Sequence, residues 1–444
     1  MQTVAAVPSA FADPREIIAR EPMHPRQILA IAIATALNAL DGFDVLSISF
    51  ASPGIAKQWG VDRAALGVVL SMELIGMALG AFALGALADR IGRRPTILAC
   101  LVIMAVGMGL AAVSSNVVML SGVRLFTGLG IGGMLAATNA IVAECSNARR
   151  RNLAIAIMAG GYPMGAIVGG SVASLLLAAT ARWQTVFVFG AVASASFIPF
   201  VLWLVPETIA FLCVRRPADA LRRINRTMIR QGRAALDEMP PADPFANRAG
   251  IREAFAPGMV GLTMLLIASY FFHIMTFYFL MKWTPKVVAD MGYTAAAAGG
   301  VLVWANVGGA TGSVTLSLLT QRFDVRRLVI GAMLGGCVAI AALGQGITGL
   351  LGLSVAAGVA GFFTNGATAG LYAVFAQAFP ARLRAGGTGL VIGIGRGGAA
   401  LGPILAGLLF SFGWPLSVVA PVMACGCLLG SIALSRVHVE TRPD

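Results

Sequence analysis

The sequence predicts an all-α membrane protein of twelve transmembrane helices, arranged as two six-helix pseudo-symmetric bundles. Three observations lead to this prediction: an apolar composition, twelve apolar runs of membrane-crossing length, and a repeat that relates the two halves. Of the 444 residues, 58% are hydrophobic and 11% are charged, and the mean hydropathy is +0.85. A soluble fold of this length could not bury so much apolar surface. The 54 glycines lie mostly inside the apolar runs, which favours close packing of helices.

The apolar runs are bounded by charged or turn residues, and each predicts one crossing of about 20 residues. The first six cover residues 28–50, 65–88, 96–113, 117–141, 152–178 and 184–205. The second six cover residues 258–281, 295–319, 327–347, 350–377, 386–411 and 415–435. The first run is too long for the apolar region of a cleavable signal peptide, so we expect it to remain as a span.

The largest polar stretch, residues 206–257, divides the runs six and six. It holds nine arginines and a Pro-Pro pair, and it predicts a cytoplasmic linker that is partly helical around residues 218–233. The predicted organisation is a cytoplasmic tail (1–27), a first bundle (28–205), the linker (206–257), a second bundle (258–435) and a second cytoplasmic tail (436–444).

The distribution of lysine and arginine predicts the orientation. With both termini in the cytoplasm, 25 of the 32 basic residues fall on cytoplasmic segments. Five fall on outside loops, namely Lys57, Arg63, Arg182, Lys282 and Lys286. Basic residues concentrate on the cytoplasmic side of membrane proteins. Topology therefore explains the net charge of +13, and we expect no nucleic-acid partner.

The two halves repeat at an offset of 233 residues. Shifting the second half back by this amount superimposes Gly398 and Gly402 on Gly165 and Gly169, and aligns three further basic or acidic motifs. The aligned motifs are Arg93-Arg94 with Arg326-Arg327, Ala148-Arg149 with Ala381-Arg382, and Glu207-Thr208 with Glu440-Thr441. Parallel repeats of this kind are typical of transporters, whose sites lie at mid-membrane between the halves.

Ionisable residues inside the runs are costly and are functional candidates by default. They are Asp41, Asp44, Glu73, Arg124, His273 and Arg396, with Glu144 near the cytoplasmic end of the fourth run. Asp41 and Asp44 share one helix face with Asn38. Two neighbouring carboxyl groups in a low-dielectric setting favour protonation, so the pair is a candidate proton carrier. A structural helix–helix hydrogen bond or ion pair is the alternative.

The basic candidates each allow two interpretations. Arg124 lies on one face with Gly128 and can hold an anion bidentately, or it can be the fixed partner of Glu144, Asp44 or another acid. Arg396 lies on a Gly-rich face and suits an anionic substrate or an ion pair. His273 falls by the repeat beside the counterpart of Asp41, where it faces the central cavity or packs as a neutral side chain.

Two motifs carry a family resemblance. The segment Gly85-Ala-Leu-Ala-Asp89-Arg90-Ile-Gly92-Arg93-Arg94 resembles the G-x-x-x-D-R-x-G-R-R signature of the major facilitator superfamily, and Arg124-x-x-x-Gly128-x-Gly130-x-Gly132 and Pro206-Glu207-Thr208 are similar to further signatures of it. The resemblance implies the twelve-helix fold. It also implies that Gly85, Asp89, Arg90, Gly92, Arg93 and Arg94 form a cytoplasmic gate.

A narrower resemblance rests on the first and eleventh runs. Asp41-Gly42-Phe43-Asp44 is similar to the start of the aromatic acid:proton symporters, and the segment around Arg396 fits their G-R-x-G pattern. This resemblance implies import of benzoate-type anions with protons across the bacterial inner membrane. The segment Ala143-Glu144-Cys145-Ser146 departs from the family's P-E-x-x-P pattern, which leaves room for a divergent substrate.

We therefore expect a proton-coupled importer of a small aromatic carboxylate that works as a monomer, without a metal or cofactor, driven by the proton gradient. Candidate side chains around the substrate ring are Tyr270, Trp304, Asn306, Asn365, Tyr372 and Gln377. The alternatives are a symporter of another organic anion, or a drug/proton antiporter, for which the Gly161-Tyr-Pro163 segment is only a partial match. An enzyme is disfavoured, because the chain lacks H-E-x-x-H and phosphate-loop motifs and its six cysteines have no metal-binding spacing.

Overall fold

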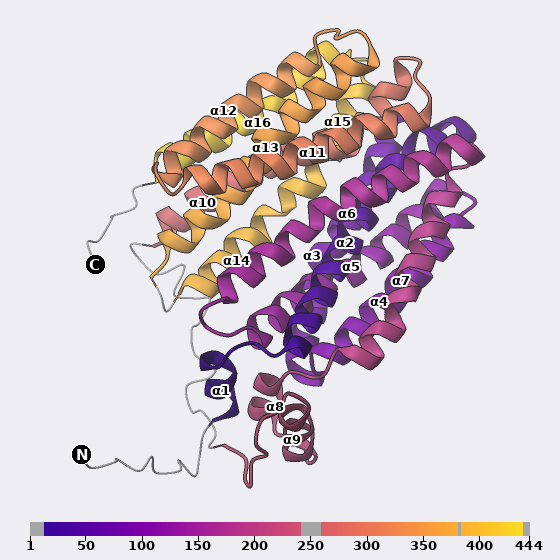
Figure 1. Cartoon of the computed structure of the whole chain (residues 1–444). Helices are drawn as coiled ribbons and strands as arrows, with labels where there is room; N and C mark the ends of the chain where they lie inside the picture. Colours follow the sequence, from indigo (N-terminus) through magenta and orange to yellow (C-terminus); the bar gives the residue numbers. More distant parts are fainter. Residues whose placement is uncertain (1–12, 241–258, 381–382, 438–444) are drawn as a thin grey trace.

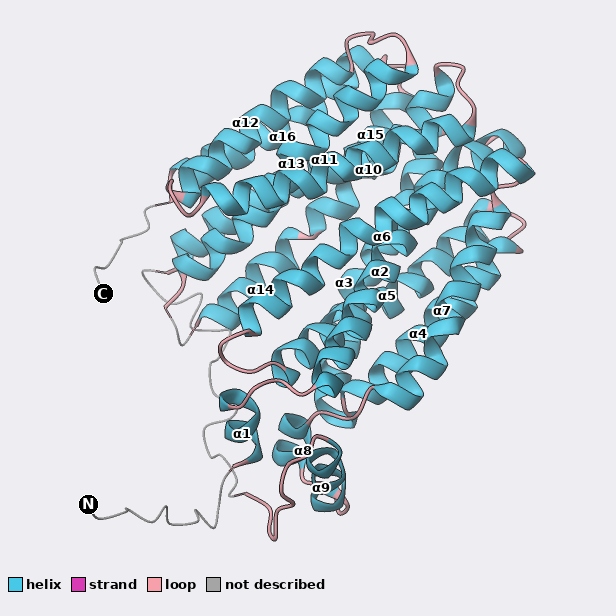
Figure 2. Ribbon diagram, in the orientation of Figure 1, coloured by secondary structure: helices cyan, strands magenta, loops and turns pink. Residues whose placement is uncertain are grey.

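The computed structural model describes residues 13–240, 259–380 and 383–437, and helices make up its architecture (Figures 1 and 2). Twelve spans in these residues are long and apolar enough to cross a membrane, as the sequence predicts. The described part contains no strand. The chain is therefore a multi-pass, all-α membrane protein.

The spans fall into two groups of helices that pack mainly within their own group, and we name these groups the first half and the second half. The first half consists of α2 (Pro25–Trp59), α3 (Arg63–Ile91), α4 (Arg93–Ala112), α5 (Val117–Cys145), α6 (Arg151–Thr180) and α7 (Gln184–Leu204). The second half consists of α10 (Val260–Asp290), α11 (Ala295–Leu319), α12 (Val325–Leu343), α13 (Leu350–Ala378), α14 (Arg384–Gly395), α15 (Gly397–Ser411) and α16 (Leu416–Ser435).

The halves lie side by side with their long axes roughly parallel (Figure 1). They meet where α3 packs on α15, α6 on α11 and α2 on α10. Short helices at the start of the chain and after α7 lie at one end of the bundle, which we name the terminal face. The opposite end, where α2, α6 and α10 finish, is the far face. Because α2, α3 and α10 lie at the junction of the halves, their polar residues meet at the centre of the molecule.

Short turns with side-chain caps connect the spans. At the start of α3, Asp62 Oδ1 accepts a hydrogen bond from the Ala65 amide at 2.6 Å. Asn116 caps α5 through the Met119 amide in the same way, at 2.8 Å. Such caps satisfy amide groups that have no partner within the helix. Gly60 ends α2 in a left-handed conformation, with a φ of 61°, which an L residue rarely adopts.

The predicted repeat is visible in the packing of glycines. Gly165 of α6 lies so close to α2 that a Cβ there would collide with the Ala39 carbonyl oxygen. Its counterpart Gly398, 233 residues later, lies equally close to the Phe271 carbonyl oxygen of α10. The next pair differs, since Gly169 meets the Phe43 ring and Gly402 meets the Met275 backbone. The repeat therefore preserves the close backbone contact at Gly165 and Gly398.

This contact gives a prediction for stability. We expect Gly165→Ala to lower the free energy of unfolding by about 1–3 kcal/mol, because the methyl group has to push α2 and α6 apart. Gly160, on the same helix, has open space around its Cβ position, so Gly160→Ala should be neutral or slightly stabilising. Thermal unfolding of the two purified variants in detergent measures the difference, and equal transitions would contradict the prediction.

A small second core covers the terminal face of the first half. It joins α1 (Pro14–Arg20), α8 (Ile209–Arg215) and α9 (Ala220–Arg230) through apolar side chains such as Ile18, Leu212 and Ile224. The Ala148 amide, in the loop between α5 and α6, donates to the Ala19 carbonyl at 2.9 Å and ties this core to the bundle. Helix α9 lies in the predicted helical stretch 218–233, whereas the sequence did not predict α1 or α8.

Two features of the spans differ from the sequence prediction. Lys282 is not in an outside loop, because α10 continues to Asp290 and buries Lys282 completely. The eleventh span is not one continuous helix, because it divides at Arg396 into α14 and α15. The linker residues 241–257 and the tail residues 438–444 lie outside the described part, as does Arg382.

Candidate functional site

The carboxyl groups of Asp41 and Asp44 lie inside the first half almost without hydrogen-bond donors. Both belong to α2, and their exposed fractions are 1% and 0%. Among the described residues, neither oxygen of Asp41 has a hydrogen-bond partner. Within the described part of the chain, the Asp44 carboxyl group accepts one side-chain hydrogen bond, from the Ser194 hydroxyl on α7 at 3.5 Å. An ionised carboxylate in such a setting is costly, so these groups are suited to holding a proton.

Beside the pair lies a buried ionic network around Glu73 of α3. The Arg124 guanidinium, on α5, pairs with Glu73 Oε1 and donates to the Asp44 carbonyl oxygen at 2.9 Å. The Lys282 ammonium, on α10, lies 3.3 Å from Glu73 Oε2 and donates to the Val45 carbonyl. All three charged side chains are fully buried. Glu73 therefore joins a cation of its own half to a cation of the other half.

We name Asp41, Asp44, Glu73, Arg124 and Lys282 the charged cluster. It contains three carboxyl groups and two cations, so its full ionisation leaves one net negative charge. Neighbouring α4 and α7 add no charged group to it, and contribute Cys100, Met108 and Ser194 instead. Binding of one proton would make the cluster neutral.

The structure thus decides between the two interpretations of Arg124. Its guanidinium also stacks on the Phe187 ring, 5.4 Å from the centroid, and contacts Met108 Sδ at 3.0 Å. These contacts bury the side chain, although its Nε has no hydrogen-bond partner among the described residues. In the structure Arg124 is thus the ion-pair partner of an acid, as in the second interpretation, and that acid is Glu73.

Arg396 lies in a different setting, among tyrosine hydroxyl groups. It sits at the junction of α14 and α15 and is only partly buried. Its guanidinium interacts with Tyr270, Tyr278 and Tyr372, and in the described part of the chain it forms no ion pair with a carboxylate. The Tyr270 and Tyr372 hydroxyl oxygens are 3.2 Å apart. An unpaired guanidinium with phenolic donors around it can receive an anionic group.

The first half also reaches this group through Tyr162 of α6, whose hydroxyl is hydrogen-bonded to that of Tyr278. Gly42, next to Asp41, lies directly against the Tyr162 backbone. We name Tyr162, Tyr270, Tyr278, Tyr372 and Arg396 the tyrosine–arginine cluster. It holds four of the five tyrosines of the chain. The two clusters therefore approach each other on α10, where Tyr278 is one turn from Lys282, and where Gly42 of α2 meets Tyr162 of α6.

Sequence reasoning missed two members of these clusters. Tyr162 was considered only as part of the Gly161-Tyr-Pro163 segment, and Lys282 was assigned to a loop. A usable signal existed for each. Tyrosine is rare in this chain, so each tyrosine inside an apolar run is a candidate for a polar site. Lys282 follows a long apolar run without any turn residue, which favours a position inside the span.

Glu144 does not join the Asp pair but belongs to the predicted gate at the terminal face. The Arg93 side chain pairs with Glu144 at 2.9 Å and with Asp89 at 2.9 Å. The Thr208 hydroxyl donates to the other oxygen of Glu144. These contacts fasten the α3–α4 turn to α5 and to the end of α7.

Glu207, in the segment between α7 and α8, also contacts the motif. It accepts a hydrogen bond from the Arg93 amide at 2.9 Å, and Gly92, with a φ of 113°, leaves room for its carboxylate. Burial raises the pKa of Glu207, while the amide groups of Arg93 and Thr208 lower it. Arg94 donates to the Leu202 carbonyl, Arg90 is exposed, and Gly85 packs near Ala136.

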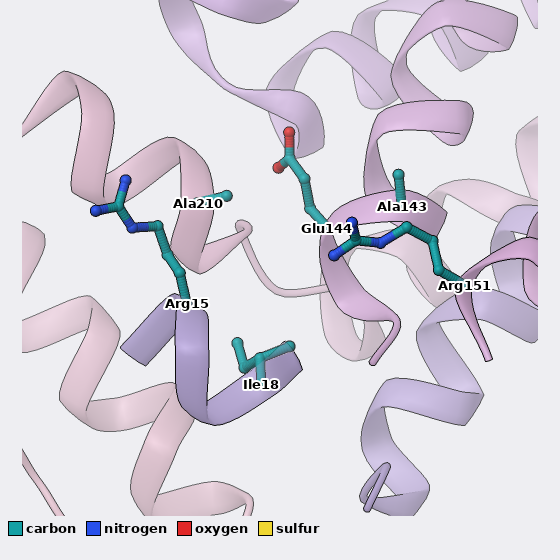
Figure 3. Close-up of a pocket in the computed structure, with 6 residues that line it drawn as sticks. All are labelled: Arg15, Ile18, Ala143, Glu144, Arg151 and Ala210. Carbon is teal, nitrogen blue, oxygen red and sulfur yellow. The ribbon is translucent and has the colours of Figure 1, made fainter. Parts of the chain in front are cut away.

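A cavity of about 210 Å³ lies beside the gate (Figure 3). Its lining residues come from α1, α5, α6 and α8, and are Arg15, Ile18, Ala143, Glu144, Arg151 and Ala210. Glu144 points between Arg15 and Arg151 in this view. The cavity is at the terminal face and not between the halves, so it belongs to the gate.

His273 lies inside the second half as a fully buried packing residue. Its Nε2 is 2.9 Å from the Thr364 carbonyl oxygen and 3.0 Å from the Thr368 hydroxyl, and its Nδ1 is 3.4 Å from Cys427 Sγ. The partners come from α13 and α16. The structure therefore places His273 away from the Asp pair.

The other predicted ring contacts are spread out. Asn306 donates to its own helix at Leu302, and Asn365 lies against Gly309 between α11 and α13. Trp304 and Gln377 are exposed. Asn38 donates to the Met158 carbonyl oxygen at 2.6 Å and leaves its own oxygen without a partner among the described residues. Of the six candidates around the ring, only Tyr270 and Tyr372 belong to the tyrosine–arginine cluster.

The chain is similar to known membrane transporters along most of its length. The profile of the Major Facilitator Superfamily matches residues 31–314 and 266–444. The chain is 28% identical to the gallate transporter of Pseudomonas putida, over 97% of this chain and 96% of that protein. It is 29% identical to the 4-hydroxybenzoate transporter PcaK of Pseudomonas putida, over 95% of each chain. It is 27% identical to the benzoate transport protein of Acinetobacter baylyi, over 94% of this chain and 90% of that protein.

Solved structures share the fold. The xylose transporter XylE of E. coli, in a partially occluded inward open conformation, matches with a TM-score of 0.72 at 15% identity, over 94% of this chain and 99% of that one. A bacterial homologue of the lysosomal transporter Spinster, in an inward-facing and occupied conformation, matches with a TM-score of 0.68 at 16% identity, over 94% of each chain.

Proposed function

The chain belongs to the major facilitator superfamily, and on that premise we propose that it imports a small aromatic carboxylate together with protons by alternating access. The observation that carries this proposal is Arg396, a cation within a membrane span that is ringed by tyrosines and has no carboxylate partner among the described residues. Relatives that match along nearly the whole chain are gallate, 4-hydroxybenzoate and benzoate transporters, which supports the same class of cargo.

The tyrosine–arginine cluster is the proposed substrate site. The guanidinium binds the carboxylate in two parallel hydrogen bonds, and the hydroxyl groups of Tyr270 and Tyr372 donate to the same anion. The aromatic ring of the substrate then packs between tyrosine rings, which favour edge-to-face contacts. Tyr270 and Phe375 already form such a pair, with centroids 5.7 Å apart.

The Asp pair is the proposed proton carrier. Moving an anion into a negative interior costs free energy unless positive charge moves with it. Asp41 and Asp44 have almost no hydrogen-bond donors, so they favour the protonated form whenever no cation compensates them. Protons taken up outside and released inside would therefore compensate the charge of the substrate.

The contacts between the halves support alternation between two open states. Near the far face, Arg63 pairs with Asp290 at 3.2 Å, and Gly67 packs directly on the Pro403 backbone. We propose that the far face is outside the cell and the terminal face is cytoplasmic, in a bacterial inner membrane. The arginines of the terminal face, among them Arg93 and Arg151, support this orientation. The monomer is the proposed functional unit.

The proposal is tested by uptake of labelled acids into proteoliposomes. A panel of hydroxybenzoates, phenylpropionates and aliphatic acids defines the cargo, and a protonophore tests the driving force. We expect accumulation of a benzoate-type acid that the protonophore abolishes. Preference for an aliphatic or cationic compound, or accumulation that survives the protonophore, would contradict the proposal. Export of the acid would favour an antiporter of the same fold.

Arg396→Lys tests the site itself. The variant keeps the charge but loses the planar pair of donors, so we expect the Michaelis constant for the aromatic acid to rise by about tenfold. Arg322, an exposed arginine at the terminal face, provides the matched control Arg322→Lys, which should leave uptake unchanged. An unaltered Michaelis constant in Arg396→Lys would remove Arg396 from the substrate site.

A further inference from the structure

Lys282 is the one member of the charged cluster that belongs to the second half. It projects from α10 and reaches Glu73 on α3 and the Val45 carbonyl on α2. The side chain is completely buried, although desolvating an ammonium group is costly. The other four members, Asp41, Asp44, Glu73 and Arg124, come from α2, α3 and α5 of the first half. Any separation of the halves at this level therefore withdraws one positive charge from three carboxyl groups.

We propose that Lys282 is a movable counter-charge that links opening of the far face to protonation of the Asp41/Asp44 pair. This inference rests on the proposed proton coupling and assigns it a residue in the second half. Nothing in the substrate site requires Lys282, because the Arg396 guanidinium is surrounded by Tyr270, Tyr278 and Tyr372. Lys282 therefore acts in proton coupling and not in substrate binding.

The electrostatic consequence of withdrawing Lys282 has a definite sign. With the far face closed, two cations compensate three carboxyl groups, so ionisation costs less than it would with one cation. With the far face open, only Arg124 remains, and it is held by Glu73. The excess negative charge then falls on Asp41 and Asp44, which take up protons from the side that has just opened. Closure returns Lys282 and favours release of the protons on the other side.

Linkage makes this relation reciprocal. If opening favours proton binding, then proton binding favours opening by the same factor. Acidic conditions should therefore shift the protein toward the far-face-open state even without substrate. Lys282 faces Glu73 on α3 and the Val45 carbonyl on α2, with Arg124 of α5 nearby. Glu73 and Arg124 in turn adjoin Asp44, so Lys282 acts on the Asp pair through them.

The test compares Lys282→Met with wild type in two transport assays. Accumulation under a proton gradient requires coupling, whereas exchange of labelled for unlabelled substrate at equal pH requires only the substrate site and alternation. We expect accumulation to fall by about tenfold while exchange changes by less than about threefold. The control is Lys57→Met, which removes an exposed lysine from α2 and should change neither assay. Full accumulation by Lys282→Met would overturn the proposal.

A second variant separates coupling from folding. Lys282→Met alone leaves three carboxyl groups with one cation, but Glu73→Gln/Lys282→Met leaves two carboxyl groups with one cation, which restores the original net charge. We expect the double variant to be more stable than Lys282→Met and still uncoupled. Recovery of accumulation in the double variant would overturn the proposal, because it has no movable charge.

A cargo-independent measurement distinguishes failure of this inference from failure of the proposed function. Hydrogen exchange at the far-face contacts, residues 63–70 and 404–410, reports opening without substrate. In wild type, the protection factors, which correct for the slower intrinsic exchange in acid, should fall when the buffer changes from mildly alkaline to mildly acidic, and Lys282→Met should lose this pH dependence. An equal response in both proteins would refute the role of Lys282, whatever the cargo is. Absence of aromatic acid exchange in wild type would refute only the proposed substrate.

Discussion

Asp41→Asn is expected to lower proton-driven accumulation of the substrate by about 100-fold. Asparagine has the shape of aspartic acid but carries no exchangeable carboxyl proton. Both oxygens of Asp41 lack hydrogen-bond partners in the described residues, so the substitution breaks no contact there. The variant should therefore fold normally and still exchange substrate at equal pH.

The control for Asp41→Asn is Asp62→Asn. Asp62 is an exposed cap of α3, and asparagine caps helices about as well as aspartate. We expect the control to match wild type in both assays. Accumulation by Asp41→Asn at the wild-type level would show that Asp41 does not carry the proton. The same assays on Asp44→Asn then reveal how the two carboxyl groups share the task.

The second large effect concerns folding and not transport. We expect Arg124→Met to lower the free energy of unfolding by about 3–5 kcal/mol, because Glu73 remains buried with one partner fewer and the Asp44 carbonyl loses its donor. Thermal unfolding in detergent should occur roughly 10 °C lower than in wild type. Arg151→Met, an exposed change at the start of α6, is the matched control and should be neutral.

A double variant tests the physical reason for this loss. Arg124→Met/Glu73→Gln removes both members of the pair and keeps one net negative charge in the charged cluster. Replacing a buried pair costs less than breaking it, so the double variant should regain part of the lost stability. If it is less stable than Arg124→Met, packing and not charge is the cause.

The sequence predicted those features of the fold that local patterns record. Hydrophobic run length predicted the spans, and the offset of 233 residues predicted the paired contacts of Gly165 and Gly398. The motif at the turn between α3 and α4 predicted that Asp89 pairs with an arginine, and Asp89 pairs with Arg93. Each of these depends on residues that are close in the chain or repeated at a fixed distance.

The sites depend on pairs that local patterns do not record. Glu73 is 51 residues from Arg124 and 209 residues from Lys282, so no spacing in the sequence joins the three. Glu144 and His273 were grouped with the Asp pair because all were ionisable residues near spans. Only their contacts with Arg93 and with Thr364 assign them to other parts of the molecule.

The break at Arg396 is also absent from the hydrophobic pattern. Glycines flank this position on both sides, and the eleventh span holds nine glycines, whereas the continuous α13 holds five. At the break, Gly395 packs on the Tyr270 ring and Gly398 on the Phe271 carbonyl of α10.

The glycine contacts that both halves share have a consequence for how the molecule diverged from a duplicated six-helix ancestor. Gly165 and Gly398 hold the same position because each half needs its own close helix contact in order to fold. A proton-binding group, by contrast, is needed in only one half. In the described spans, the buried acids Asp41, Asp44 and Glu73 all come from the first copy. The close helix contact thus recurs in both halves, whereas the buried acids of the described spans occur in one half only.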